Sequence, residues 1–216
     1  MVITFYGVSC FRVQLGDFTI AFDPPSKTSS LKPPRFEADI IFSSHNHILH
    51  NGLEELSGKK TSERPFFISG PGEYEVSRVW ARGISSFHDN EGGKTRGQNT
   101  IYTLEVEDIR LCHLGDLGTA RLEAPTLEEI GEVDLLFVPI GGKDVLDPEG
   151  AATIAGLIEP KILIPMHYHQ AKTAIGEFLK ELGEEKIVPE AKWTLKKKDL
   201  HEEGSRIVLL EPLMNS

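Results

Sequence analysis

Long hydrophobic runs are missing from this chain, and no apolar stretch approaches the roughly 18 residues that a membrane-spanning helix needs. The first residues, MVITFYG, have the pattern of a strand and lack the basic and apolar segments of a secretory signal. We therefore expect a cytoplasmic protein that does not enter a membrane.

Cysteine is scarce as well, with only 2 among 216 residues. Cys10 and Cys112 both lie in apolar, strand-like stretches, and two thiols over this length do not make a disulfide framework. We expect both side chains to be buried and reduced, as small hydrophobic groups of a core.

Positive charge is the third shortage. The chain has 23 lysine and arginine residues against 33 aspartate and glutamate residues, for a net charge of -10. A negative chain repels phosphate backbones, so the composition argues against nucleic acid as a partner and leaves a small molecule as the expected substrate. The one basic run, residues 196–198, is followed closely by acids and reads as a solvated turn.

The length fits a single domain over residues 1–216. Alternating apolar and polar residues predict two hairpins, which turn at residues 16–17 and 107–108. Short, nearly continuous apolar runs predict strands that are buried on both faces. These strands are expected at residues 38–44, 65–70, 133–142, 160–166 and 206–212.

Helix signals are fewer. Residues 51–59 read as one short helix, and Thr126 with Glu129 has the spacing of a capping box. Asp147 before Pro148 predicts a helix start, and residues 172–182 carry an apolar face. Many buried strands with few helices favour an α/β (α+β) fold of two packed sheets with helices outside.

Histidines follow the ends of several predicted strands. Such ends gather at one edge of a sheet, where binding sites form. Neutral imidazoles suit zinc and similar metals, and a carboxylate can bridge two ions. The pattern therefore predicts a metal site built from strand ends, with these residues: His45, His47, His50, His88, His113, Asp116 and His167.

Plainer interpretations stay open for the same residues. His88 alone would suit the surface, His113 would suit a core, and residues 45–47 (HNH) would suit a polar loop without metal. His169 and His201 are read as surface histidines.

Eight strings follow one another along nearly the whole chain: GVSCF, FDPP, SSHNHILHN, SGPGEYEV, FHDNEGGKTRGQNTIY, CHLGDLG, VDLLFVPIGG and IPMHYH. In this order they resemble the metallo-β-lactamase superfamily, and most closely its branch of small hydrolases similar to L-ascorbate-6-phosphate lactonase. The resemblance implies a four-layer αββα sandwich of two mixed β-sheets flanked by helices. It also implies a metal centre along the edge between the sheets, and only by this likeness a homo-oligomer.

The resemblance also implies roles for individual residues. His45, His47 and His88 would form a first metal site, His50 and His167 a second, and Asp116 would bridge the two. Asp23 resembles the acid that orients a loop histidine from behind the metal ligands. Asp116 and His113 would take part in catalysis, the latter through proton transfer or from behind the ligands. For Arg96, Gly97 and Asn99 the sequence leaves a turn-forming and a substrate-binding role open.

Three positions depart from the pattern of the resembled family. Leu49 stands where the loop His-x-His-x-Asp-His has its aspartate, Asn46 where this branch often has another, and Val8 where some relatives have histidine. Leucine cannot bind a metal, so the resemblance implies one firm Zn or Mn site and a second that is weak or absent. We expect a metal-dependent hydrolase of a small lactone, ester or phosphorylated compound. The alternatives are a degenerate member that binds without hydrolysing, and a nuclease, which the acidic charge disfavours.

Overall fold

The structure is a computed structural model, and it describes residues 1–52, 56–58, 64–168, 171, 173–201 and 204–213. A first mixed sheet has the strand order β12-β1-β2-β3-β4-β5. Its neighbours pair antiparallel as far as β3, while β3, β4 and β5 run parallel. The strands are β1 (Val2–Phe5), β2 (Phe11–Leu15), β3 (Phe18–Phe22), β4 (Ile40–Ser43), β5 (Phe66–Ser69) and β12 (Trp193–Thr194).

A second mixed sheet has the order β13-β11-β10-β9-β8-β7-β6. Strands β9, β10, β11 and β13 run parallel, and β6 to β9 form an antiparallel meander. Its strands are β6 (Gly72–Val76), β7 (Val79–Phe87), β8 (Gln98–Val106), β9 (Ile109–His113), β10 (Leu135–Pro139), β11 (Ile162–Met166) and β13 (Arg206–Ile207). Two packed mixed sheets confirm the predicted fold class.

Both predicted hairpins are confirmed. Leu15 pairs with Phe18 across the turn at residues 16–17, and Val106 pairs with Ile109 across the turn at residues 107–108. Glu107 and Asp108 both have positive φ angles, of 52° and 56°, as the tight turns that match the twist of a β-hairpin require.

The main core lies between the two sheets, and a second core lies between the second sheet and the helices. Strand β10 shows the division, because its side chains alternate. Leu135 and Phe137 belong to the cluster between the sheets, whereas Leu136 and Val138 belong to the cluster under the helices. A strand buried on both faces reads as a continuous apolar run, which explains why the sequence predicted it.

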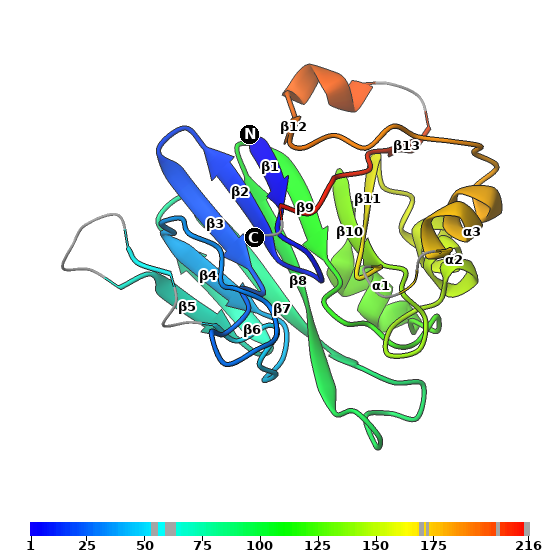
Figure 1. Cartoon of the computed structure of the whole chain (residues 1–216), viewed down its shortest axis with the longest axis horizontal. Coiled ribbons are helices and arrows are strands. Elements are labelled where there is room, and N and C mark those ends of the chain that lie inside the picture. Colours follow the sequence, from blue (N-terminus) through cyan, green and yellow to red (C-terminus); the bar gives the residue numbers. More distant parts are fainter. Residues whose placement is uncertain (53–55, 59–63, 169–170, 172, 202–203, 214–216) are drawn as a thin grey trace.

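The helices are α1 (Ala124–Ile130), α2 (Pro148–Ile158), α3 (Ala174–Glu181) and the 3-10 helix η1 (Lys197–His201). Figure 1 shows α1, α2 and α3 together beside β10 and β11, and Ile130, Ile154 and Phe178 bury their side chains there. Among the described residues, no helix is long and apolar enough to cross a membrane.

Two helix starts test the capping predictions. The Asp147 carboxylate accepts a hydrogen bond from the Gly150 backbone N–H at 2.8 Å, which confirms that start. The capping box at Thr126 is wrong, because the helix begins earlier, with Glu123 as N-cap and no side-chain cap. Pro125 lies in the first turn, where its fixed φ angle favours a helix start.

The outer face of the first sheet is covered differently. Ala21 and Ile41 pack there against Ala38 and Leu56 from connecting segments, and the residues that the structure describes include no helix on this face. The helix predicted at residues 51–59 falls partly outside the described residues, and residues 51–52 and 56–58 are not helical. Cys10 and Cys112 are buried free thiols, as predicted.

Candidate metal centre

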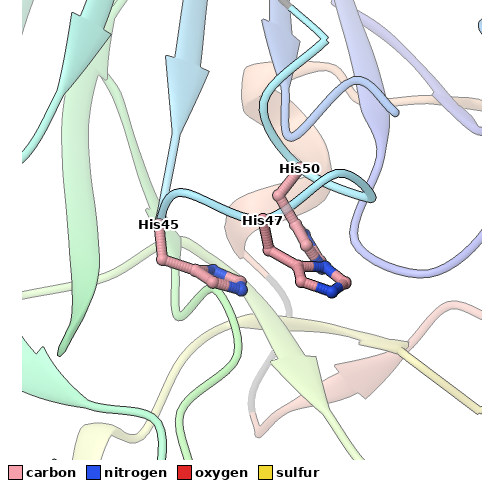
Figure 2. Close-up of side chains that lie close together, drawn as sticks. All are labelled: His45, His47 and His50. Carbon is pink, nitrogen blue, oxygen red and sulfur yellow. The ribbon is translucent and has the colours of Figure 1, made fainter. Parts of the chain in front are cut away.

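Four strands of the two sheets end at one place. The loop after β4 carries His45, His47 and His50, and Figure 2 shows the three rings on the same side of that loop. The other chemical groups come from the second sheet, where His88 follows β7 and Asp116 and His167 follow β9 and β11. The prediction that polar residues at separate strand ends meet is confirmed by these positions.

One carboxylate oxygen is the centre of the cluster. Asp116 Oδ2 lies 3.3 Å from His50 Nε2, 3.3 Å from His88 Nε2, 3.2 Å from His167 Nε2 and 3.9 Å from His45 Nε2. Four imidazoles therefore present the same ring nitrogen to one buried acid, from both sheets.

The donor atoms fall into groups of three with spacings below 4.8 Å that suit a metal ion. One group is His45, His88 and Asp116, and another is His50, Asp116 and His167. Asp116 belongs to both, as the resemblance implies for a bridging ligand. His47 is the difference, because it groups with His45 and His50 and is exposed, rather than grouping with His88.

The group of His45, His88 and Asp116 has buried polar atoms that lack hydrogen-bond partners and that suit a cation. His45 Nε2, His88 Nε2 and Asp116 Oδ1 are buried and have no hydrogen-bond partner among the described residues. Buried polar atoms are normally paired, so the unpaired ring nitrogens of His45 and His88, which both lie near Asp116 Oδ2, call for a ligand. Imidazole nitrogens and a carboxylate oxygen are donors that zinc or manganese accepts.

Asp23 fixes the direction of the His45 ring through Ser44. Its carboxylate accepts hydrogen bonds from Ser44 N at 2.7 Å and from Ser44 Oγ at 2.8 Å. The Ser44 hydroxyl proton is thereby used, so His45 Nδ1, 3.0 Å from Ser44 Oγ, is the donor of that contact. The remaining lone pair is on Nε2, toward Asp116. Asp23 thus has the orienting geometry that the resemblance implied.

His50 is held by a residue that sequence reasoning missed. Ser9 Oγ lies 2.7 Å from His50 Nδ1, and Asp23 Oδ2 lies 3.4 Å from the same nitrogen. Ser9 belongs to the loop between β1 and β2, and no spacing relates it to the histidine loop. The carbonyl oxygen of the neighbouring Val8 accepts a hydrogen bond from His167 N at 2.7 Å. Val8 has a positive φ angle of 54°.

Asn99 is a second residue without a clear sequence signal. It is buried, and its Oδ1 accepts a hydrogen bond from Asp116 N at 2.9 Å. Its Nδ2 donates to Ser86 Oγ and to Leu114 O, both at 2.8 Å. Gly115 makes this contact possible, because a Cβ atom there would lie 2.3 Å from Asn99 Oδ1. Asn99 lies in β8 and positions the Asp116 loop, which is neither the turn-forming nor the substrate-binding role that the sequence left open.

His113 lies behind the candidate metal ligands, which is one of the two placements that the resemblance implied. Nε2 lies 3.0 Å from Ser9 O, and Nδ1 accepts from Gly115 N at 3.2 Å. The ring is fully buried and stacks on Phe22 with centroids 4.7 Å apart. Because backbone groups occupy both nitrogens, this geometry assigns His113 to holding the β1–β2 loop rather than to proton transfer with substrate.

Protonation follows from burial and from neighbouring charges. Burial, with the charge of His50, lowers the pKa of His45 to about 4, so its imidazole is neutral at pH 7. Burial raises the pKa of Asp116, but the neighbouring imidazoles of His50 and His167 lower it by a larger amount. The net shift of the Asp116 pKa is well downward. Burial lowers the pKa of His50, and Asp116 and Asp23 outweigh this effect and raise it. At neutral pH the cluster therefore presents a neutral imidazole, that of His45, and an ionised carboxylate, that of Asp116.

A cavity of about 410 Å³ opens onto the cluster. Leu49 lines it beside His50 and His167, so an aliphatic group occupies the position where the resembled loop has aspartate. Asn46 instead stabilises its own loop, and its Oδ1 accepts a hydrogen bond from Asn51 Nδ2 at 2.6 Å. His169 lies outside the described residues, as does the side chain of His201.

Comparisons with known proteins agree with this geometry. The sequence profile of the beta-lactamase superfamily domain matches residues 2–167, which include the six residues predicted as metal ligands and also His113. A crystal structure from Thermotoga maritima, assigned to a zinc-dependent hydrolase of the metallo-β-lactamase superfamily, aligns with a TM-score of 0.77. It is 31% identical, and the alignment covers 97% of each chain.

Sequence relatives have similar names. The UPF0173 metal-dependent hydrolase YtkL of Bacillus subtilis is 26% identical, in a match that covers 78% of this chain and 86% of that protein. A UPF0173 metal-dependent hydrolase of Carboxydothermus hydrogenoformans is 28% identical, over 82% of this chain and 90% of its own length. With the domain profile, the T. maritima likeness and the buried histidine–aspartate cluster in agreement, this chain belongs to the metallo-β-lactamase superfamily.

Proposed function

We propose that this protein is a metal-dependent hydrolase of a small ester or lactone, with one firmly held Zn or Mn ion. The observation that carries the proposal is the set of three buried donors without partners on His45, His88 and Asp116. The names of the relatives, all metal-dependent hydrolases, support the reaction class. The lactone is the substrate class of the branch that the sequence strings resemble.

Each residue has a defined part in this proposal. His45 and His88 bind the ion through Nε2, and Asp116 binds it through its carboxylate. His47 is exposed on the same loop, and its ring can turn toward the ion as the resemblance implies. When bound, such an ion supplies a water nucleophile at neutral pH and polarises the substrate oxygen that gains charge. The cavity of about 410 Å³ admits a small molecule to that position.

Leu49 is the reason for proposing one firm site. A second ion would have His50, His167 and a share of Asp116, and two neutral imidazoles do not offset its charge. Repulsion from a first ion that shares Asp116 would weaken the binding of the second ion further. The same buried donors argue against a degenerate member, because a protein that no longer binds metal gains nothing from unpaired polar groups.

Elemental analysis of protein purified without chelator tests the metal. His88→Ala is expected to abolish tight binding, because it removes one of the three buried donors. His201→Ala is the matched control, because η1 follows β12 at the opposite end of β1 from the cluster (Figure 1). Metal content that is unchanged in His88→Ala would overturn the assignment.

A further inference from the structure

Two cationic side chains line the cavity over the metal cluster. Arg96 comes from the loop between β7 and β8, and Lys143 comes from the loop after β10. Arg96 also lines the two neighbouring cavities, of about 680 and 620 Å³. A ligand that approaches the cluster from either side therefore passes the guanidinium.

The backbone of Arg96 is fixed beside a metal ligand. The Asp89 carboxylate accepts four backbone hydrogen bonds within the loop, and the shortest comes from Arg96 N at 2.7 Å. The loop closes where His88 N donates to Gly97 O at 3.1 Å. Because His88 and Arg96 lie at the two ends of this closed loop, the backbone of Arg96 is anchored relative to the cluster.

The Arg96 head group already holds a carboxylate at the cavity wall. One terminal nitrogen pairs with Asp144 Oδ1, and the other donates to Lys143 O at 3.1 Å. A guanidinium has five N–H donors, and among the described residues these contacts use two of them. The side chains of Arg96 and Asp144 are 32% and 39% exposed, so an incoming anion can displace Asp144 without stranding a buried charge.

The charge around the cavity also favours an anion. Asp116 is the only carboxylate in the two donor groups that share it, because Leu49 replaces an acid of the resembled loop. The cavity lining also includes Asp144, so Arg96 and Lys143 balance two acids before a metal binds, and a bound dication would leave a net positive charge. A planar guanidinium is suited to two-pronged binding of carboxylate or phosphate.

We propose that Arg96, with Lys143, binds a phosphate or carboxylate group of the substrate, and that Asp144 occupies Arg96 when no ligand is present. That the bound anion is part of a substrate, and is hydrolysed, rests on the proposed hydrolase function. The binding of an anion by Arg96 does not depend on that function, and it is tested separately.

The test measures the thermal unfolding midpoint of the purified protein in sodium phosphate, in sodium acetate and in sodium chloride at equal ionic strength. A pH of about 8 keeps ordinary histidines neutral. The natural protein should be stabilised by one of the first two salts beyond chloride, and which one identifies phosphate or carboxylate. Arg96→Gln should weaken that affinity by about tenfold or more, as expected for loss of a hydrogen bond to a charged group.

Asp144→Asn separates the proposal from a purely structural ion pair. If Asp144 competes with the ligand, this variant should bind the anion more tightly than the natural protein does. If the pair only joins two loops, the variant should lose stability and gain no affinity, which would overturn the proposal. Arg82→Gln is the matched control, because Arg82 pairs with Glu73 at 2.8 Å, is similarly exposed, and does not line the cavity.

Metal content measured in every variant keeps the two proposals distinct. A natural protein that binds metal but shows no stabilisation by phosphate or acetate beyond chloride refutes the anion site alone. Arg96→Lys keeps the charge but loses the planar fork, so its anion affinity should fall between those of the natural protein and Arg96→Gln. Equal affinity in all three would also refute the proposal.

Discussion

Replacing Asn99 by alanine tests whether the protein positions Asp116 through its backbone. The substitution removes the acceptor of Asp116 N–H and the donor to Leu114 O, both in a buried region. Ser86 loses one contact but still donates to Asn99 O at 3.0 Å, a bond that the substitution keeps. Two buried backbone groups are therefore left without partners.

Each such group costs about 1–3 kcal/mol, so Asn99→Ala should lower the free energy of unfolding by roughly 2–6 kcal/mol. A domain has about 5–15 kcal/mol in total, so a variant that loses the smaller amounts should still fold. With a urea slope near 2 kcal/mol per molar, the urea midpoint should fall by about 1–3 M. Substitution of residues that orient metal ligands typically lowers metal affinity by about 10–100-fold. We expect a loss of that order in Asn99→Ala.

The assay combines urea unfolding in chelator with zinc titration of the folded protein. Ser86→Ala is the matched control, because it removes a hydrogen bond to Asn99 Nδ2 and leaves the Asp116 N–H bond intact. It should lower the free energy of unfolding by about 1 kcal/mol and leave zinc affinity unchanged. An equal loss of zinc affinity in both variants, or none in Asn99→Ala, would refute the reasoning.

Three further predictions concern the metal and the loops. Leu49→Asp should raise the metal content from about one ion toward about two at equal free metal; two tightly held ions in the natural protein would contradict the role of Leu49. Chelation should lower the melting temperature by mass action and leave the far-ultraviolet circular dichroism at room temperature unchanged, because the core between the sheets is apolar. Burial raises the pKa of Asp89, but four backbone N–H donors outweigh it and hold the pKa at about 2, below the ordinary 3.8. The stability that this carboxylate contributes is thus present above about pH 4 and is lost as the pH falls through about 2. The free energies of unfolding of the natural protein and Asp89→Asn, measured with urea in the presence of chelator, should therefore converge over that range.

Much of the fold could be predicted from the sequence because each strand has a local signature. Strands buried on both faces appear as apolar runs, and the two hairpins appear as turns between alternating stretches. The failed capping box shows the limit of such signals. Thr126 and Glu129 have the right spacing, yet Pro125 competes locally and the helix starts before it. The prediction of an enzyme is supported by the hydrolase names of relatives that cover most of the chain.

The candidate site could be predicted as a set of residues but not as an arrangement. Polar groups after strand ends are visible in the sequence, whereas their grouping depends on how the two sheets pack. His113 and Asp116 lie three residues apart, but His113 ends β9 inside the core and Asp116 lies beyond the turn. Ser9 and Asn99 act through hydrogen bonds to residues that are distant along the chain, and the sequence gives no pattern that reveals those partners.

The loop between β1 and β2 has a consequence for how the protein acquires its metal. Through Val8 and Ser9 it contacts His167, His50 and His113, the last of these 104 residues away along the chain. A ribosome releases the N-terminal part first, at about 5–20 residues per second, so this loop and the first histidines emerge well before the second sheet exists. The loop histidines His45, His47 and His50 emerge together, but the group of His45, His88 and Asp116 is complete only after residue 116 has emerged and both sheets have packed. A metal held by the latter group would therefore be one available to the finished fold rather than one met by the growing chain.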